Sequence, residues 1–406
     1  MKLNISFWLK FSLLNLCIVA LLGTLMRYKI GFEFPYLDQK NIQHSHSHFA
    51  FAGWISHTLM TLMVYYLQQN IGSFLGQKYK KIIIANLVCA YGMLVFFIIQ
   101  GYGLFSISFS TASVLVSYYF AYQFFRDLKQ LDSNLLSKNW FQAALLFSVI
   151  SSLGTFYLAY MMASKNIVQE WYLSSIYYYL HFQYNGWFFF ACMGLLFGFL
   201  NLKKSEHVFY NRAYILFAAA CLPSYFLSTL WLKLSLWIYI LAVMSAIVQV
   251  YAWFKLLLVL KKTKGITVAH YPAFLRYILL FVGFALTIKL LLQLGSTIPS
   301  LSDLAFGFRP IVIAYLHLVL LAVISLFLLF YVYANQLLFL DNKVRLGVIL
   351  FSIGVFLNEI VLAVQGVASF SYTVIPHVDG LLFTVAVLLL TSIGLTAFFS
   401  LRRKCK

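Results

Sequence analysis

The chain alternates long apolar segments with short polar segments along almost its whole length. Each apolar segment has about 20 residues, the length that a helix needs to cross roughly 30 Å of hydrocarbon at 1.5 Å per residue. This pattern predicts an all-α, polytopic membrane protein with twelve transmembrane helices. The expected spans are 7–26, 47–68, 80–101, 104–125, 140–163, 177–200, 210–230, 233–257, 273–294, 310–334, 344–368 and 378–400.

Composition supports this class of protein. Of the 406 residues, 63% are hydrophobic and 10% are charged, whereas soluble domains have roughly 25% charged residues. A water-soluble fold is therefore excluded, and we expect residues 1–406 to form a single integral membrane domain surrounded by lipid bilayer.

The net charge of +19 would indicate a nucleic-acid partner in a soluble protein, but its distribution here follows the predicted topology. If the N-terminus is inside, 21 of the 29 basic residues fall in cytoplasmic segments. We therefore expect no nucleic acid as a partner, and both termini on the cytoplasmic side of a bacterial inner membrane. No small-residue cleavage site precedes Arg27, so the first span is expected to be a retained helix and not a signal peptide.

An internal repeat carries histidine. The segment HFAFAGW (His48–Trp54) opens the second span, and HFQYNGW (His181–Trp187) opens the sixth. The tenth span opens in a similar way with HLVLLAV, which starts at His317. Four spans separate each histidine from the next, so the chain is expected to form three pseudo-repeated four-helix arcs. The approximate repeat units are 1–130, 131–265 and 266–400.

The repeat predicts a layer of histidines near the outer face, because the second, sixth and tenth helices all run from outside to inside. His48, His181 and His317 would lie at similar depths, and His377 would lie in the same layer just before the last span. A single such histidine could simply be an interfacial or core residue that bonds to a carbonyl. Recurrence favours a metal or haem ligand, because intramembrane ionisable groups are costly and imidazole ligates haem iron, copper and zinc.

The cluster HSHSH precedes the second span and contains three candidate ligands. Residues four apart share a helix face, so His44 and His48 should lie on one side, while His46 and His57 should point elsewhere. A surface HxHxH segment that binds metal weakly is an alternative for His44 and His46.

Twelve helices in three arcs, with histidines on the second, sixth and tenth, resemble the catalytic subunit of the haem-copper oxidase and nitric oxide reductase family. The resemblance implies a b-type haem between the second and tenth helices. If the haem-ligand positions of the family are transferred to the matching positions of this sequence, the ligands are His48 and His317, with His44 or His46 as alternatives to His48. The helix layout of the whole chain carries the resemblance, while its motifs match only locally.

The resemblance has further implications for function and partners. It implies electron transfer or binding of a diatomic gas (NO or O2), a cytochrome or quinol electron donor, and small partner subunits. Arg309 and Arg27 are candidates to pair with haem propionates, with a snorkelling or interfacial arginine as the alternative. Trp54 and Trp187 could form walls around a flat cofactor, although helix packing accounts for them equally well.

The chain departs from the family at the second metal site. The resemblance makes His181 the copper-type histidine, but the expected seventh span contains no histidine to complete a copper site. Tyr315 stands where the family has the ligand of a second haem. Glu359 and Lys289 lie within spans, where they could form a buried pair or a proton relay. An oxidoreductase of the haem-copper type is therefore only one of the functions to consider.

A second function is compatible with the same residues. A metal transporter or sensor without haem could use His48, His181, His317 and His377 to bind a metal ion. The five cysteines are scattered and form no CxxC or CxxCH motif, and no nucleotide-binding loop indicates an energised pump.

Overall fold

The computed structural model describes residues 3–72, 76–205, 207–262 and 271–402, with the side chains of 303–305 left out. Every element of regular secondary structure in these ranges is a helix, which confirms the all-α prediction. The β feature that they contain is an isolated bridge between Leu135 and Lys203. Nine helices in the described ranges are long and apolar enough to cross a membrane. They are Ile5–Gly31, Gly76–Gln100, Leu104–Leu128, Leu136–Ala163, Leu236–Lys262, Ala273–Gly295, Arg309–Ala334, Asn342–Phe370 and Val378–Arg402.

The other three expected spans fall on helices that are divided into shorter segments. Expected spans 47–68 and 177–200 each contain a π-helical segment between two α-helices. Expected span 210–230 corresponds to the short apolar helix α9 (Val208–Cys221) and the 3-10 helix η4 (Pro223–Thr229). Proline lacks a backbone N–H and clashes with the preceding turn, so Pro223 explains the change of helix type. A multi-pass helical membrane protein fits these findings, and twelve spans remain a prediction.

The chain divides into two compact units. Unit 1 comprises Met1–Phe120, Ala273–Leu279 and Ile324–Lys406, and unit 2 comprises Ala121–Pro272 and Leu280–Val323. Unit 1 contains α1 (Ile5–Gly31), α2 (Gln39–Phe49), η1 (Ala50–Ser56), α3 (His57–Asn70), α4 (Gly76–Gln100), most of α5 (Leu104–Leu128), α14 (Leu326–Ala334), α15 (Asn342–Phe370) and α16 (Val378–Arg402).

Side-chain caps determine where several helices of unit 1 begin. Asn4 accepts a hydrogen bond from the Phe7 amide, and Asp38 accepts one from Asn41, so each satisfies an amide of the first turn of α1 or α2. Asp341 caps α15 in the same way.

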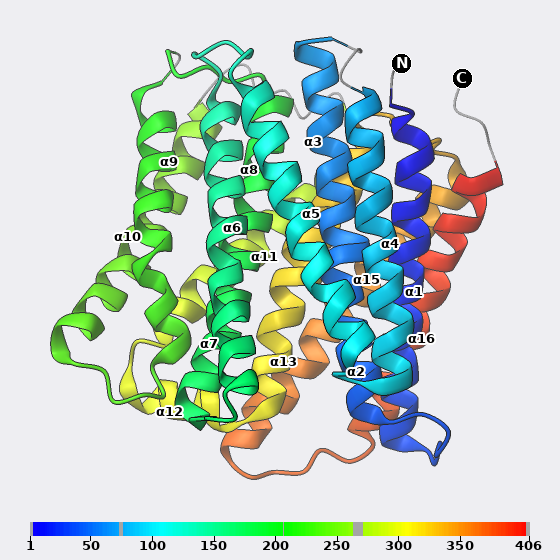
Figure 1. The fold of residues 1–406 in the computed structure, drawn as a ribbon, viewed down its shortest axis with the longest axis vertical. Helices are drawn as coiled ribbons and strands as arrows, with labels where there is room; N and C mark the ends of the chain where they lie inside the picture. The colour runs from blue at the N-terminus through cyan, green and yellow to red at the C-terminus, as the bar shows by residue number, and fades with distance from the viewer. Residues whose placement is uncertain (1–2, 73–75, 206, 263–270, 403–406) are drawn as a thin grey trace. The chain divides into compact units, whose positions relative to one another are not determined.

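Helices α1, α15 and α16 pack side by side in unit 1 (Figure 1). Lys10 Nζ donates to the Leu401 carbonyl at 3.2 Å near one end of the α1–α16 pair, and Thr24 Oγ1 donates to the Ala386 carbonyl at 3.0 Å further along it. The two helices are therefore antiparallel. The beginning of α1 and the end of α16 lie at the same end of unit 1.

Unit 2 is built around a buried aromatic core. Trp140 on α6 is fully buried and stacks on Phe197, with ring centroids 5.5 Å apart. The unit contains α6 (Leu136–Ala163), α7 (Gln169–His181), η3 (Phe182–Phe188), α8 (Phe189–Phe199), α9, η4, α10 (Leu236–Lys262), α12 (Pro299–Gly307) and α13 (Arg309–His317). Helix α11 (Ala273–Gly295) and the π-helical segment η6 (Leu318–Ser325) each have residues in both units.

Candidate functional site

A π-helical segment follows each of the three repeat histidines. Segment η1 begins two residues after His48, η3 begins directly after His181, and η6 begins directly after His317. Such segments are rare in proteins as a whole, and those that occur often lie at functional sites. The three sequences share a helical distortion at the same place, in addition to the histidine that reveals the repeat.

Neighbouring helices stabilise the π segment of unit 1. Asn15 on α1 donates to the Gly53 carbonyl at 2.6 Å, and Asn86 on α4 donates to the Ala52 carbonyl at 3.1 Å. Both asparagines are buried. Tyr91 donates in turn to the Asn15 side-chain oxygen at 2.7 Å. Amide side chains thus satisfy carbonyls of the distorted turn, which water could not reach inside a membrane.

His44 and His48 share one face of α2, as predicted. The His48 ring stacks on Phe97, with centroids 4.3 Å apart and planes inclined by 22°. Its Nε2 atom lies 3.2 Å from the Tyr102 hydroxyl. The His44 ring packs edge-on against Tyr102 at 4.6 Å, and its buried Nε2 atom has no hydrogen-bond partner.

His46 and His57 face α1, which confirms that they point away from His48. His46 Nδ1 donates to the Val19 carbonyl at 3.0 Å, and His57 Nε2 donates to the Trp8 carbonyl at 3.3 Å. His57 is fully buried, whereas the His46 ring is half-buried. A histidine that donates from Nδ1 carries its lone pair on Nε2, the form in which imidazole binds a metal.

His317 has the same tautomer as His46. Its Nδ1 atom donates to the Ile313 carbonyl, one turn earlier on α13, at 2.8 Å. The ring is half-buried. His46 and His317 thus each use Nδ1 to fix the ring on a backbone carbonyl.

Trp54 connects two of the π segments within unit 1. Its indole N–H donates to Ser325 Oγ at 2.8 Å, and both residues are almost fully buried. Trp54 lies on η1 and Ser325 is the last residue of η6. The indole nitrogen of Trp54, which was predicted to form a wall around a flat cofactor, therefore binds the π segment that follows His317.

Both ring nitrogens of His181 are bonded to protein groups. Nε2 donates to the Cys221 carbonyl at 2.9 Å, and the Asn185 amide donates to Nδ1 at 3.1 Å. The Ser224 hydroxyl lies 3.5 Å from Nε2. The Cys221 carbonyl is near the break at Pro223, which explains why it takes side-chain donors. This environment is that of a satisfied core histidine.

The surroundings of the remaining predicted residues differ from one another. His377 is exposed and has a left-handed backbone with φ of 59°. Arg309 begins α13 and is exposed. Tyr315 packs edge-on against Tyr184 at 6.2 Å. Arg27 is close enough to Asp379 for electrostatic attraction. Within the described part of the chain, no three His, Cys, Asp or Glu residues come together as a metal centre.

Glu359 and Lys289 belong to different units. Glu359 is half-buried and accepts a hydrogen bond from the Asn358 amide at 3.2 Å. Lys289 is 5% exposed and lines a cavity of about 10 Å³, room for about one water molecule, together with Asn185, Cys221 and Gln249. The sequence reading missed this polar cluster, although Gln249 within an apolar helix was a signal for it.

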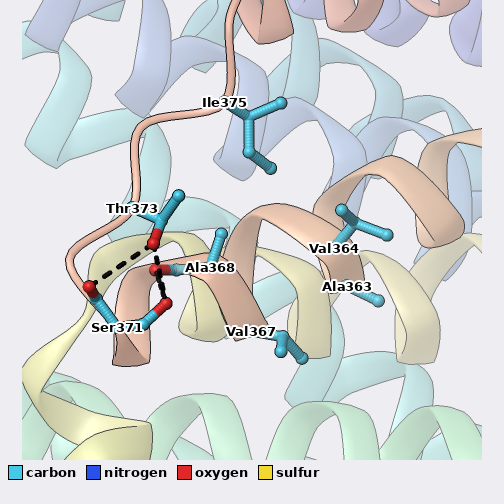
Figure 2. Close-up of a pocket in the computed structure, with 7 residues that line it drawn as sticks. All are labelled: Ala363, Val364, Val367, Ala368, Ser371, Thr373 and Ile375. Atoms are coloured by element: carbon cyan, nitrogen blue, oxygen red, sulfur yellow. Dashed lines mark hydrogen bonds between the residues drawn. The ribbon is translucent and has the colours of Figure 1, made fainter.

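A shallow groove lies at the end of α15 and is larger, at about 470 Å³. Figure 2 shows that aliphatic side chains of α15 line one part of it, while Ser371 and Thr373 bond to each other beyond the helix end. Its lining contains no histidine. The groove is therefore separate from the residues that the repeat identified.

Comparison with models of known protein families and with curated protein sequences found no match for this chain.

Proposed function

We propose that this chain is a haem-binding membrane protein that resembles the catalytic subunit of the haem-copper oxidases and carries electrons or binds a diatomic gas. In this proposal it has twelve transmembrane helices in three arcs and lies in a bacterial inner membrane with both termini in the cytoplasm. A cytochrome or quinol would supply the electrons.

The observation that carries the proposal is the shared tautomer of His46 and His317. Each donates Nδ1–H to a backbone carbonyl, at 3.0 Å and 2.8 Å, and so has its lone pair on Nε2. Metal-bound histidines usually have this second hydrogen bond, which orients the ring and raises the basicity of the ligand. Two such rings fit the donor set of a b-type haem.

In this proposal the ligand on α2 is therefore His46, one of the alternatives to His48. The ring of His48 stacks on Phe97, and its Nε2 atom is bonded to the Tyr102 hydroxyl. A haem bound by His48 would have to break that bond, whereas His46 already has the ligand tautomer.

Register along the chain gives further support. His46 lies eight residues before Trp54, and His317 lies eight residues before Ser325, the residue that Trp54 bonds. The charge pattern predicts the same direction for both helices. When bound, haem iron with two histidine ligands would supply a reversible one-electron couple, and a small gas would have to displace one of the two histidines. The Val19 and Ile313 carbonyls of the chain orient the two imidazole rings.

Copper does not fit the residues near His181. Both ring nitrogens have protein partners, and α9, which provides most of the seventh predicted span, contains no histidine. We therefore propose no binuclear centre and no oxygen reduction at one.

The test is a reduced-minus-oxidised absorption spectrum of the protein purified from a haem-replete host. We expect b-type haem bands in the wild type and their loss in both His46→Ala and His317→Ala. His207→Ser is the matched control, because His207 caps α9 and serine preserves an N-cap. Full haem content in His317→Ala would overturn the proposal. Stoichiometric zinc or copper without haem would favour the metal transporter or sensor.

A further inference from the structure

A separate group of side chains gathers where α2 meets the connection between α4 and α5. His44 and His48 are one helical turn apart on the same face, and their rings interact electrostatically. Tyr102 lies against both rings, with centroids 4.6 Å from His44 and 6.1 Å from His48. None of these residues is a haem ligand in the proposal above.

We propose that His44, His48 and Tyr102 form a site for a divalent transition-metal ion of the zinc or copper type. The first argument is the unsatisfied nitrogen of His44. Its Nε2 atom is buried and has no hydrogen-bond partner. A buried polar atom without a partner costs free energy of about 1–3 kcal/mol. A metal ion bound at Nε2 would supply the missing interaction.

The second argument is the spacing of the other two donors. His48 Nε2 and the Tyr102 hydroxyl oxygen are 3.2 Å apart. Zinc bonds of about 2.0–2.1 Å in a tetrahedral site place neighbouring donors about 3.3 Å apart. The pair therefore already has the spacing of two ligands of one ion.

The surroundings favour coordination by these rings. Phe97 stacks on the face of His48 and holds the ring, so Nε2 stays directed at the Tyr102 oxygen, and the ion would replace the hydroxyl proton between these two atoms. Asp38 attracts a positive charge at His44 and opposes the repulsion from Lys40. Tyr102 is 52% exposed, which leaves a path for the ion and for a water molecule as fourth ligand.

The donor set selects the kind of metal. Two imidazole nitrogens and a phenolic oxygen suit zinc and copper, whereas calcium and magnesium prefer oxygen ligands alone. Coordination by phenolate also requires that the Tyr102 hydroxyl proton be released to solvent. The ion takes the place of that proton, and no electron is transferred.

The test is titration of the full-length, chelator-treated protein in detergent with Zn²⁺ by isothermal calorimetry. We expect one site. His44→Ala and His48→Ala should each weaken zinc binding by about 10²-fold. Ligands held in one protein bind the same ion at a high effective concentration, and this advantage is lost when one ligand is removed. Tyr102→Phe should weaken binding less and abolish the release of about one proton, measured in buffers of different ionisation enthalpy.

His207→Ser is the control, because His207 caps α9 and belongs to neither of the two proposed sites. We expect unchanged zinc affinity in this variant and unchanged haem content in His44→Ala, so the two proposals can fail separately. Size-exclusion profiles would show whether each variant is folded. The metal site is overturned if His44→Ala binds zinc like the wild type, or if His207→Ser loses as much affinity as His44→Ala.

Discussion

The indole N–H of Trp54 donates a hydrogen bond to the hydroxyl of Ser325 at 2.8 Å, and both residues are almost fully buried. They are 271 positions apart in the sequence. The bond joins the π segment that follows His48 to the one that follows His317. A direct side-chain contact thus connects two copies of the repeat within unit 1.

The first prediction concerns this bond. Ser325→Ala leaves the buried indole N–H without an acceptor, so we expect the free energy of unfolding to fall by about 0.5–2 kcal/mol. Unfolding by sodium dodecyl sulfate in mixed micelles measures the change. Trp54→Phe and the double variant complete a cycle whose coupling energy isolates the bond. Ser352→Ala, which loses only a bond within its own helix, is the control. A coupling energy of zero would contradict the prediction.

The second prediction concerns close packing at Gly186 in η3. An added Cβ would lie 2.5 Å from Cβ of Phe147 on the adjacent helix α6, too close for two carbon atoms. We expect Gly186→Ala to lower the free energy of unfolding by about 1–3 kcal/mol, because a packed core resists overfilling. Gly283→Ala is the matched control, because nothing lies within 4 Å of its added Cβ. Equal thermal stability of the two variants would count against this packing.

The third prediction concerns His181 as a structural residue. His181→Ala removes the donor to the Cys221 carbonyl and the acceptor of the Asn185 amide, so two buried groups lose a partner. We expect a loss of about 2–4 kcal/mol in the free energy of unfolding and no change in metal content measured by elemental analysis. His181→Gln should recover part of the stability. Loss of stoichiometric copper at unchanged stability would show that His181 is a ligand instead.

The fourth prediction concerns the number of membrane crossings. Twelve spans place Lys165 and Lys233 outside and Lys203 inside. Alkaline phosphatase fused after Lys165 or Lys233 should therefore be active, and a fusion after Lys203 should be inactive, because the enzyme folds only outside the cytoplasm. Green fluorescent protein fused at the same positions provides the reciprocal readout. An inactive phosphatase fusion after Lys233 would mean that residues 210–230 do not cross the membrane.

Much of the helical architecture could be predicted from the sequence because hydrophobic length determines it. The apolar segments correspond to helices in the described residues, and the i, i+4 rule correctly paired His44 with His48. The π segments could not be predicted. Their sequences, AFAGWIS and LVLLAVIS among them, are those of ordinary apolar helices. The side chains that donate to the η1 carbonyls, Asn15 and Asn86, belong to other helices.

The environment of each histidine could not be predicted for the same reason. A helical wheel separates His46 from His48, but the Val19 carbonyl that fixes the His46 tautomer comes from the packing of α1. The Cys221 carbonyl that accepts from His181 comes from α9, next to the break at Pro223. Spacing along one helix identifies which residues share a face. It does not identify the partner on that face.

The three π segments also constrain how the chain tolerates insertions and deletions. A π turn contains one residue more than the α turn it replaces, and one residue turns an α-helix by about 100°. Deletion of a single residue from η1 would let regular α-helix form with little change of phase, whereas an α-helix with all seven residues would rotate His44, His46 and His48 by about that angle relative to the residues after Trp54. The histidine face and the tryptophan face of this helix are thus held in phase by one additional residue.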